Sequence, residues 1–216
     1  MVIAIKEPGL AYAAVPKAGC SSVKEMLAEI DPEFTPPAPS ETGHTTYHTA
    51  YPTRRWRGDH FQRHENAFRF TVVRDPIKRL MSVYTNRVVD MKDLHKSRKL
   101  RNRGVLPLDP DPDTFFANLK RYARLSSVIK HHILPTWMFA GPDLSAYDKV
   151  YRTNQMNELA QDLSAKAGKS VVPRRSNSSR SSLTFDDLKP ETQQALRPVL
   201  ADEYRYLSGY FDNPLD

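Results

Sequence analysis

Two short apolar segments of this chain each run through a turn directly into a segment with helical periodicity. Residues 9–15 (GLAYAAV) predict a buried strand, and the small residues of PKAGCSS at 16–22 predict a tight turn after it. Residues 68–73 (FRFTVV) predict a second strand, which ends at Arg74. Because consecutive strand–loop–helix units favour parallel strands, the sequence predicts an α/β fold with a central parallel β-sheet flanked by helices.

Each of these two strands is followed by a helix with its own start signal. Apolar residues at helical spacing begin at Val23, and Ser21 or Ser22 is placed to cap that helix. Asp75 is typical of an N-cap residue, and Pro76 suits the first helical position. The pattern also predicts a strand over 147–152 and helices from about Thr114, over 154–167 and around Leu196 to Tyr204.

The length of the chain and its single cysteine set the broad class. A chain of 216 residues suits one α/β domain with a sizeable core, so residues 1–216 are predicted to form a single domain. With Cys20 as its one cysteine, the sequence forms no intramolecular disulfide. No run approaches the ~18 apolar residues of a membrane span, and a signal-peptide pattern is missing, so we expect a cytoplasmic protein with no membrane span.

The formal net charge of +7 predicts that the protein attracts anions. Nucleic acid, membrane headgroups, a phosphorylated cofactor and an acidic substrate all satisfy that condition. Charge therefore does not choose among these partners, and the choice depends on motifs.

The segment VPKAGCSSVKEML (15–27) has the residues of an oxyanion site. A loop between a strand and a helix start presents unpaired backbone N–H groups and the positive end of the helix dipole. Lys17 adds a positive charge, Gly19 permits close approach of a ligand, and Ser21 and Ser22 supply hydroxyl donors. The lysine comes too early for a Walker A loop, which needs a glycine and a lysine at its end.

The early lysine gives the segment a resemblance to a known family. PKAGCSS resembles the 5′-phosphosulfate loop of sulfotransferases, and FTVVRDPIKRLMSVY (70–84) resembles their 3′-phosphate motif. HHILPTWMF (131–139), YDKVYRTNQMNEL (147–159) and EYRYLSGYF (203–211) are similar to segments of the carbohydrate-type sulfotransferase family 2. The resemblance implies a P-loop-like three-layer fold and dependence on 3′-phosphoadenosine 5′-phosphosulfate (PAPS), with adenosine 3′,5′-diphosphate as product.

Carried over by position, the resemblance implies a cofactor site in three parts. The 5′-phosphosulfate is expected to be surrounded by Lys17, Ala18, Gly19, Cys20, Ser21 and Ser22. Arg74 and Ser82 are expected to hold the 3′-phosphate, and the planar guanidinium of Arg74 suits that role. A basic loop containing Arg174, Arg175 and Ser178 is expected to close over the nucleotide.

Two departures from the family pattern concern the acceptor and the compartment. Thr136 stands where the family commonly has glutamine, which puts acceptor recognition in doubt. The membrane anchor and paired cysteines of the Golgi members are missing, which favours a bacterial-type soluble enzyme. Neither departure touches the two cofactor motifs.

The expected chemistry is an in-line displacement in which Lys17 stabilises the charge on the leaving phosphate, with no metal. A histidine is the natural general base for the acceptor hydroxyl. Related enzymes place it between the two cofactor motifs, where we favour His48, then His44, over His60 and His64.

The acceptor is expected to be a small molecule or a glycan, with a carbohydrate hydroxyl as one candidate. His132 and Trp137 are candidates to bind it; packing explains His132 equally well, and large aromatic residues such as Trp137 are more often part of the core. The basic segment 92–104 is expected to be a solvated helix end or loop, with contact to an acidic acceptor as the alternative.

Two other functions fit parts of the sequence. A P-loop-type small-molecule kinase would share the phosphate-binding geometry but needs a late lysine and a carboxylate that holds Mg²⁺. A basic nucleic-acid-binding module would explain the charge, but the sequence contains no known reader motif, so no nucleic-acid partner is expected. The sequence leaves the oligomeric state open.

Overall fold

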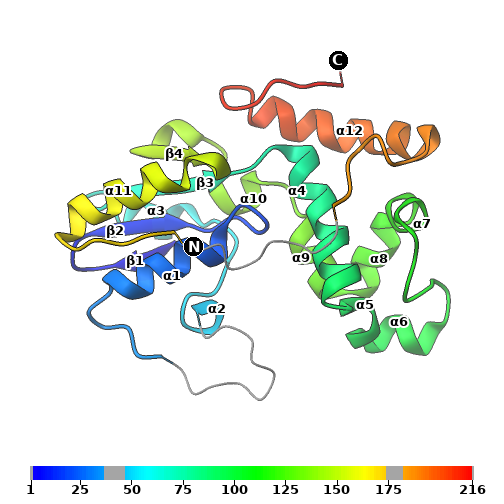
Figure 1. The fold of residues 1–216 in the computed structure, drawn as a ribbon, viewed down its shortest axis with the longest axis horizontal. Helices are drawn as coiled ribbons and strands as arrows, with labels where there is room; N and C mark the ends of the chain where they lie inside the picture. Colours follow the sequence, from blue (N-terminus) through cyan, green and yellow to red (C-terminus); the bar gives the residue numbers. More distant parts are fainter. Residues whose placement is uncertain (1, 37–46, 174–181, 216) are drawn as a thin grey trace. The chain divides into compact units, whose positions relative to one another are not determined.

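A computed structural model describes residues 2–36, 47–173 and 182–215 (Figure 1). The chain divides into two compact units, each described here by itself. The sheet unit comprises Met1–Val73 and Thr136–Asn177, and the helical unit comprises Arg74–Pro135 and Ser178–Asp216. The single domain expected from the chain length stays a prediction.

The sheet unit contains a four-stranded sheet in the order β1-β2-β3-β4. These strands are β1 (Ile3–Ile5), β2 (Leu10–Ala13), β3 (Phe68–Val73) and β4 (Lys149–Arg152). The pairs β2–β3 and β3–β4 are parallel, as predicted, whereas β1 runs antiparallel to β2 at one edge. Strand β1 was not predicted, because three residues are too few to show a periodicity.

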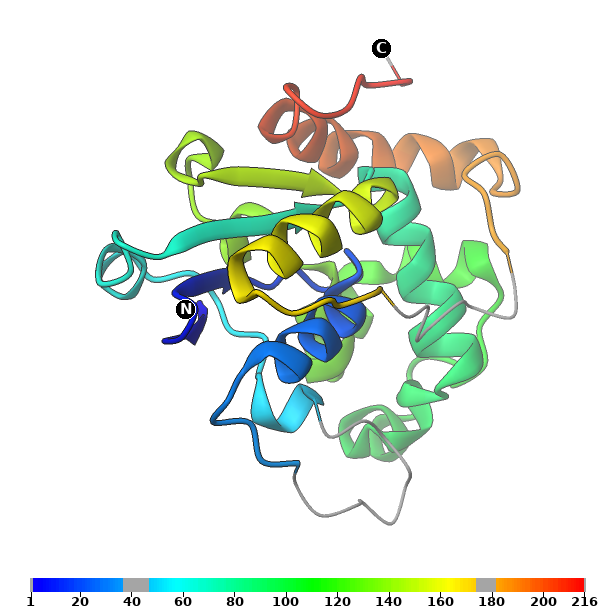
Figure 2. The same ribbon diagram turned by 60° about the vertical axis from the view of Figure 1, so that its left-hand side comes forward.

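One face of this sheet packs against two helices, α1 (Cys20–Ile30) and α11 (Met156–Ala167), which Figure 2 shows beside the strands. Tyr12 lies opposite Phe70 in the register, and their rings stack with centroids 5.0 Å apart. The other face is covered as well, because Thr71 is fully buried and Arg69 lies over the ring of Phe61. The sheet unit is therefore three-layered, as predicted.

Short elements complete the sheet unit. They are α2 (Tyr47–Ala50), α3 (Gly58–Gln62), α10 (Trp137–Ala140) and the 3₁₀ turns η2 (Leu144–Ala146) and η3 (Thr153–Gln155). Phe61 belongs to α3, so this helix supplies part of the layer that covers the second face of the sheet.

The helical unit begins with α4 (Pro76–Val83), which continues as the π-helix η1 (Tyr84–Asp90). Its other helices are α5 (Asp93–Lys96), α6 (Arg98–Arg103), α7 (Pro112–Ala117), α8 (Leu119–Leu125), α9 (Ser127–Ile133) and α12 (Pro190–Tyr206). Its core contains an aromatic cluster: the ring of Phe115 packs edge-on against Phe116, with centroids 5.1 Å apart, and lies 5.2 Å from the ring centroid of Tyr122.

The helix-start predictions had mixed outcomes. Asp75 caps α4 by accepting a hydrogen bond from the Lys78 amide at 2.8 Å, with Pro76 at the first position, as predicted. The prediction that Ser21 or Ser22 caps the first helix is wrong, because the N-cap of α1 is Gly19. Gly19 has a φ of 72°, in the left-handed region that glycine adopts easily. The helix begins directly after it, so both serines lie inside the first turn.

The basic segment 92–104 is more ordered than expected. It forms α5 and α6, which bury Leu94 and Leu100 while most of the cationic side chains face solvent. The segment therefore forms two short amphipathic helices. The solvated surface expected from its charge is found on one side of them, and the other side is buried.

Candidate functional site

The loop between β2 and α1 holds two residues in the left-handed backbone conformation. Lys17 has a φ of 65°, and Gly19 follows with 72°. A side chain with a Cβ rarely adopts this conformation, so the surrounding structure holds Lys17 there against local strain. Successive amides in such a turn, followed by the first turn of a helix, form a concave set of N–H donors that suits an anion.

Buried side chains hold the loop between β2 and α1 in place within the sheet unit. Ala18 is fully buried, and Cys20 is a buried free thiol in the core cluster that includes Tyr12 and Val23. The Cα of Gly19 faces α11, where an added Cβ would lie 3.5 Å from the Met156 sulfur. In this part of the chain Lys17, Ser21 and Ser22 are half-buried, whereas Cys20 belongs to the packed core.

The side chain of His48, a residue of α2, lies against this loop. Its Nε2 is 2.8 Å from the Ser21 hydroxyl, and its Nδ1 is 3.0 Å from the Lys24 ammonium. Both partners belong to α1, and Ser21 lies in the first turn of that helix. The structure thus places the favoured general-base candidate beside the predicted phosphosulfate loop.

Aromatic packing brings α2, and His48 with it, onto α1. The ring of Phe34 stacks between Tyr47 and Tyr51, with centroid distances of 5.9 and 5.7 Å. Tyr51 donates a hydrogen bond to Asp31 at 2.7 Å, at the C-terminal end of α1. These contacts join the two ends of α2 to the residues that follow α1.

Lys24 is a site residue that the sequence analysis missed. Its side chain is fully buried on α1, and its ammonium donates to the Thr53 hydroxyl at 2.6 Å as well as contacting His48. Burial lowers the pKa of Lys24, and the nearby Cys20 thiol opposes that shift. The available signal was a lysine directly after Val23, on the face of the helix that carries Met26 and Leu27.

Arg74 and Ser82, the predicted 3′-phosphate residues, belong to the helical unit. Arg74 directly follows β3 and is half-buried. Burial lowers the pKa of its guanidinium; the charge of Asp75 raises this pKa, and the charge of Arg79 lowers it further. The Ser82 hydroxyl is buried and donates to the Arg79 carbonyl at 2.7 Å.

Arg79 is a second residue that the sequence analysis missed. Its buried guanidinium forms an ion pair with Glu203 at 3.1 Å and donates to the Leu134 carbonyl at 2.9 Å and the His132 carbonyl at 3.4 Å. Arg79 thereby joins α4 to α12 and to the end of α9. This structural role accounts for the presence of Arg79 in the motif RDPIKR (74–79).

The other residues predicted for the site either belong to other elements of the structure or lie outside its described part. His132 contacts the Val128 carbonyl through Nδ1 at 2.8 Å, and Trp137 is 48% exposed at the start of α10. His60 and His64 lie together around α3, with ring centroids 5.6 Å apart. His44, Arg174, Arg175 and Ser178 lie outside the described residues.

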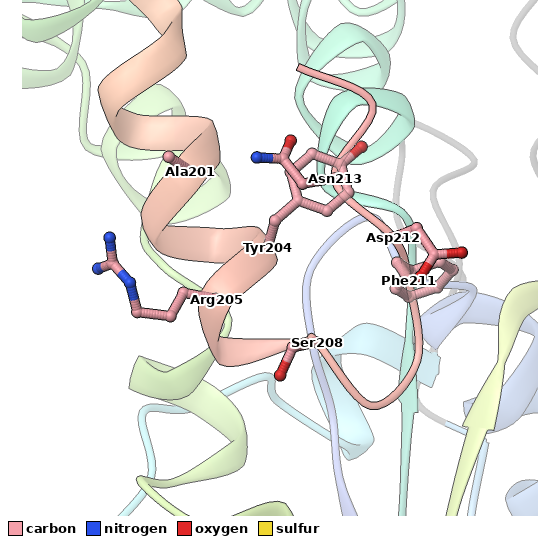
Figure 3. A pocket seen from close by; sticks show the side chains of 7 residues that line it. All are labelled: Ala201, Tyr204, Arg205, Ser208, Phe211, Asp212 and Asn213. Atoms are coloured by element: carbon pink, nitrogen blue, oxygen red, sulfur yellow. The ribbon is translucent and has the colours of Figure 1, made fainter. Parts of the chain in front are cut away.

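A pocket of about 350 Å³ lies in the helical unit near the C-terminus (Figure 3). It is lined by Ala201, Tyr204, Arg205, Ser208, Phe211, Asp212 and Asn213. Tyr204 donates to the carboxylate of Asp75 at 2.7 Å, so its hydroxyl is engaged by the cap of α4. None of the residues predicted from the sequence to bind cofactor or acceptor lines this pocket.

The described part of the chain shows neither a metal-binding cluster nor a helix that could span a membrane. Within ranges 2–36, 47–173 and 182–215, no three His, Cys, Asp or Glu side chains gather in a way that could hold a metal ion. In the same part of the chain, none of the helices has the length and apolarity needed to cross a bilayer. The expected cytoplasmic location stays a prediction.

The sheet topology and the loop define an α/β protein with a left-handed turn at Lys17 and Gly19 between its second strand and first long helix. A family model for the sulfotransferase family, of the carbohydrate type, matches residues 1–210, and the chain belongs to that family. Sulfuryl transfer to a small-molecule or glycan acceptor, from a PAPS-type donor, is the general activity of this class. Searches of curated proteins and of solved structures gave no match.

Proposed function

We propose that this protein transfers the sulfuryl group of PAPS to an acceptor hydroxyl, with a carbohydrate as the favoured acceptor class. The observation that carries the proposal is the loop after β2, where a lysine and a glycine in left-handed conformation precede the N-terminus of an eleven-residue helix. The donor set fits the ligand, because amides, hydroxyls and an ammonium are the groups that bind phosphate and sulfate oxygens.

Lys17 is the residue proposed to stabilise the leaving group. Sulfuryl transfer, like phosphoryl transfer, moves a charged group in line between two oxygens, so catalysis consists mainly of positioning and charge neutralisation. The Lys17 ammonium and the amides of the loop and of the first turn of α1 supply fixed positive charge where the departing phosphate becomes more negative. Ser21 and Ser22 add hydroxyl donors to the same group.

Arg74 and Ser82 are proposed to bind the 3′-phosphate. The strand topology supports this assignment for Arg74, because β2 and β3 are parallel neighbours and Arg74 is the first residue after β3. Ligands of open α/β sheets bind beyond the carboxyl ends of the strands. Arg174 and Ser178 remain proposed contacts of the nucleotide by resemblance alone.

His48 is proposed as the general base, with His44 as the second candidate. The 2.8 Å contact between its Nε2 and Ser21 supports the choice, since Ser21 belongs to the proposed phosphosulfate loop. A base within reach of that loop is placed to accept the proton of an acceptor hydroxyl as it attacks the sulfur. This role requires an imidazole that is uncharged before the reaction.

Melting experiments with adenosine 3′,5′-diphosphate test the donor assignment. A nucleotide that binds only the folded protein raises the melting temperature in proportion to its affinity and concentration. We expect a clear rise with adenosine 3′,5′-diphosphate and a smaller one with adenosine 5′-monophosphate, which lacks the 3′-phosphate. A screen of hydroxyl-bearing acceptors with ³⁵S-labelled PAPS would then identify the product.

Equal shifts with both nucleotides would contradict the 3′-phosphate assignment. The absence of any shift at millimolar adenosine 3′,5′-diphosphate would contradict the donor itself. The variant Arg74→Gln is the matched control, because it should reduce the response to adenosine 3′,5′-diphosphate to that of the monophosphate.

A further inference from the structure

Lys24 occupies a position that favours an apolar side chain. It is fully buried on α1 next to the core residues Val23 and Met26. Its ammonium contacts the Thr53 hydroxyl and the His48 ring, and within the described residues it forms no ion pair with a carboxylate. A buried ammonium without a counter-ion costs stability, so a role in function would explain its presence.

The contact between Lys24 and His48 restricts where the hydrogens lie. Nζ and Nδ1 are 3.0 Å apart, which leaves room for one hydrogen along the line between them. A charged ammonium has no acceptor, so it donates, and Nδ1 accepts with its lone pair. The single hydrogen of the uncharged ring then sits on Nε2, which donates to the Ser21 oxygen at 2.8 Å.

A charged imidazole ring does not fit this arrangement. Imidazolium carries a hydrogen on both nitrogens, so an N–H of His48 would point at an N–H of the Lys24 ammonium, and two positive charges would meet. Protonation of His48 therefore requires either loss of a proton from Lys24 or rupture of the contact. The two side chains together hold one positive charge while the contact persists.

We propose that Lys24 is a positioning residue that holds the His48 ring against Ser21 in its uncharged form. The proposal rests on the function proposed for the loop, because an uncharged ring is what a general base at this position needs. In the form with charged Lys24, Nε2 bears the hydrogen and His48 is a donor to Ser21. The ring becomes a base at Nε2 when the Lys24 ammonium transfers a proton to Nδ1 and the Nε2 hydrogen leaves to solvent, so that the neutral Lys24 amine then accepts from Nδ1–H.

Lys24 is a charged group in direct contact with the His48 ring, with Nζ 3.0 Å from Nδ1. On α1, the Cys20 thiol is a further titratable group near Lys24. Just after α2, the Tyr51 hydroxyl donates to Asp31 at 2.7 Å, so that carboxylate is already hydrogen-bonded. Because Lys24 contacts the ring directly, the protonation of His48 is expected to respond to the charge of Lys24.

Ring-nitrogen NMR of the ligand-free protein tests this role without any substrate. In ¹⁵N-labelled protein, the His48 signals are assigned with His48→Gln, and their pH titration is compared in wild type and Lys24→Met. Removal of the neighbouring cation should raise the titration midpoint of His48 by about one pH unit. In the wild type near neutral pH, Nε2 should bear the hydrogen and Nδ1 should be bare.

Two further variants separate charge from placement. Lys24→Gln keeps a hydrogen-bond donor without the charge, so His48 should keep the Nε2–H form and still titrate at higher pH than in the wild type. Thr53→Val removes the other partner of Lys24 and should leave the His48 titration close to that of the wild type. This variant controls for a general loosening of the segment between α2 and α3.

Stability separates this role from a merely structural one. Because Lys24→Met removes a buried charge, its melting temperature should equal or exceed that of the wild type even though the His48 titration shifts. An unchanged midpoint in both Lys24→Met and Lys24→Gln would overturn the proposal, and so would a wild-type ring with its hydrogen on Nδ1 at neutral pH. Failure of adenosine 3′,5′-diphosphate to bind would instead overturn the proposed function and leave this result intact.

Discussion

Lys17 has a backbone conformation that is costly for any residue with a Cβ. For L-residues the left-handed region costs about 1–2 kcal/mol relative to the right-handed one. In the described part of the chain, Lys92 is the other non-glycine residue with a positive φ, at 51°. The two lysines therefore share a strained conformation, whereas the proposed catalytic role belongs to Lys17 alone.

The substitution Lys17→Gly should separate strain from catalysis. Glycine adopts the left-handed conformation freely, so the free energy of unfolding should stay the same or rise by about 1 kcal/mol. Loss of the ammonium should lower turnover by about 10²–10³-fold, the usual cost of removing a group that stabilises developing charge. Urea unfolding and ³⁵S transfer from PAPS measure the two effects.

Lys92→Gly is the matched control for this prediction. It relieves the same kind of strain and removes an exposed contact with Asp109, seen at 2.7 Å, which contributes little because both side chains are more than half exposed. Its turnover should equal that of the wild type. A similar loss of activity in both variants would show that the Lys17 effect comes from the backbone.

At the scale of elements, α4 depends on the ion pair of Arg79 with Glu203. Both side chains are only 7% exposed, and the guanidinium also donates to two backbone carbonyls at the C-terminal end of α9. Removing one member of a buried pair leaves the other charge without its partner in a place that water does not reach. The pair therefore holds α4, α9 and α12 in one arrangement within the helical unit.

We expect Arg79→Met to lower the free energy of unfolding by about 3–5 kcal/mol, because it takes the guanidinium away from the buried Glu203 carboxylate. The double variant Arg79→Met, Glu203→Leu should regain much of that loss, since it removes both charges. Denaturant unfolding of the three proteins measures these differences. The exposed pair of Arg205 and Asp202 provides the control: Arg205→Met should cost less than about 1 kcal/mol.

Helix and strand boundaries were predictable where the deciding signal was local. Residues 68–73 are β-branched and aromatic, and the structure has β3 over Phe68–Val73. The cap of α4 depends on Asp75 and an amide three residues away. The start of α1 was misjudged because serine is a common cap, whereas the packing of the loop selects a left-handed Gly19.

For the molecule as a whole, the family and the loop chemistry predict turnover without an added metal ion. The positive charge that the reaction requires is assigned to Lys17 and Arg74 and to the amides of the loop, so these groups take the place that Mg²⁺ has in a kinase. Turnover with PAPS should therefore stay within about twofold when EDTA is added. Loss of activity with EDTA, restored by Mg²⁺, would favour the kinase alternative.

The amino-acid sequence by itself determined the α/β fold, the sulfotransferase resemblance and the position of the loop proposed to bind the phosphosulfate, because each depends on residues close together in the chain. Only the tertiary structure decided that Lys24, His48 and Ser21 meet. Their contact depends on the stacking of Phe34 with Tyr47 and Tyr51. Local sequence patterns do not predict which side chains far apart in the chain will pack together. The roles proposed for these residues follow from that packing.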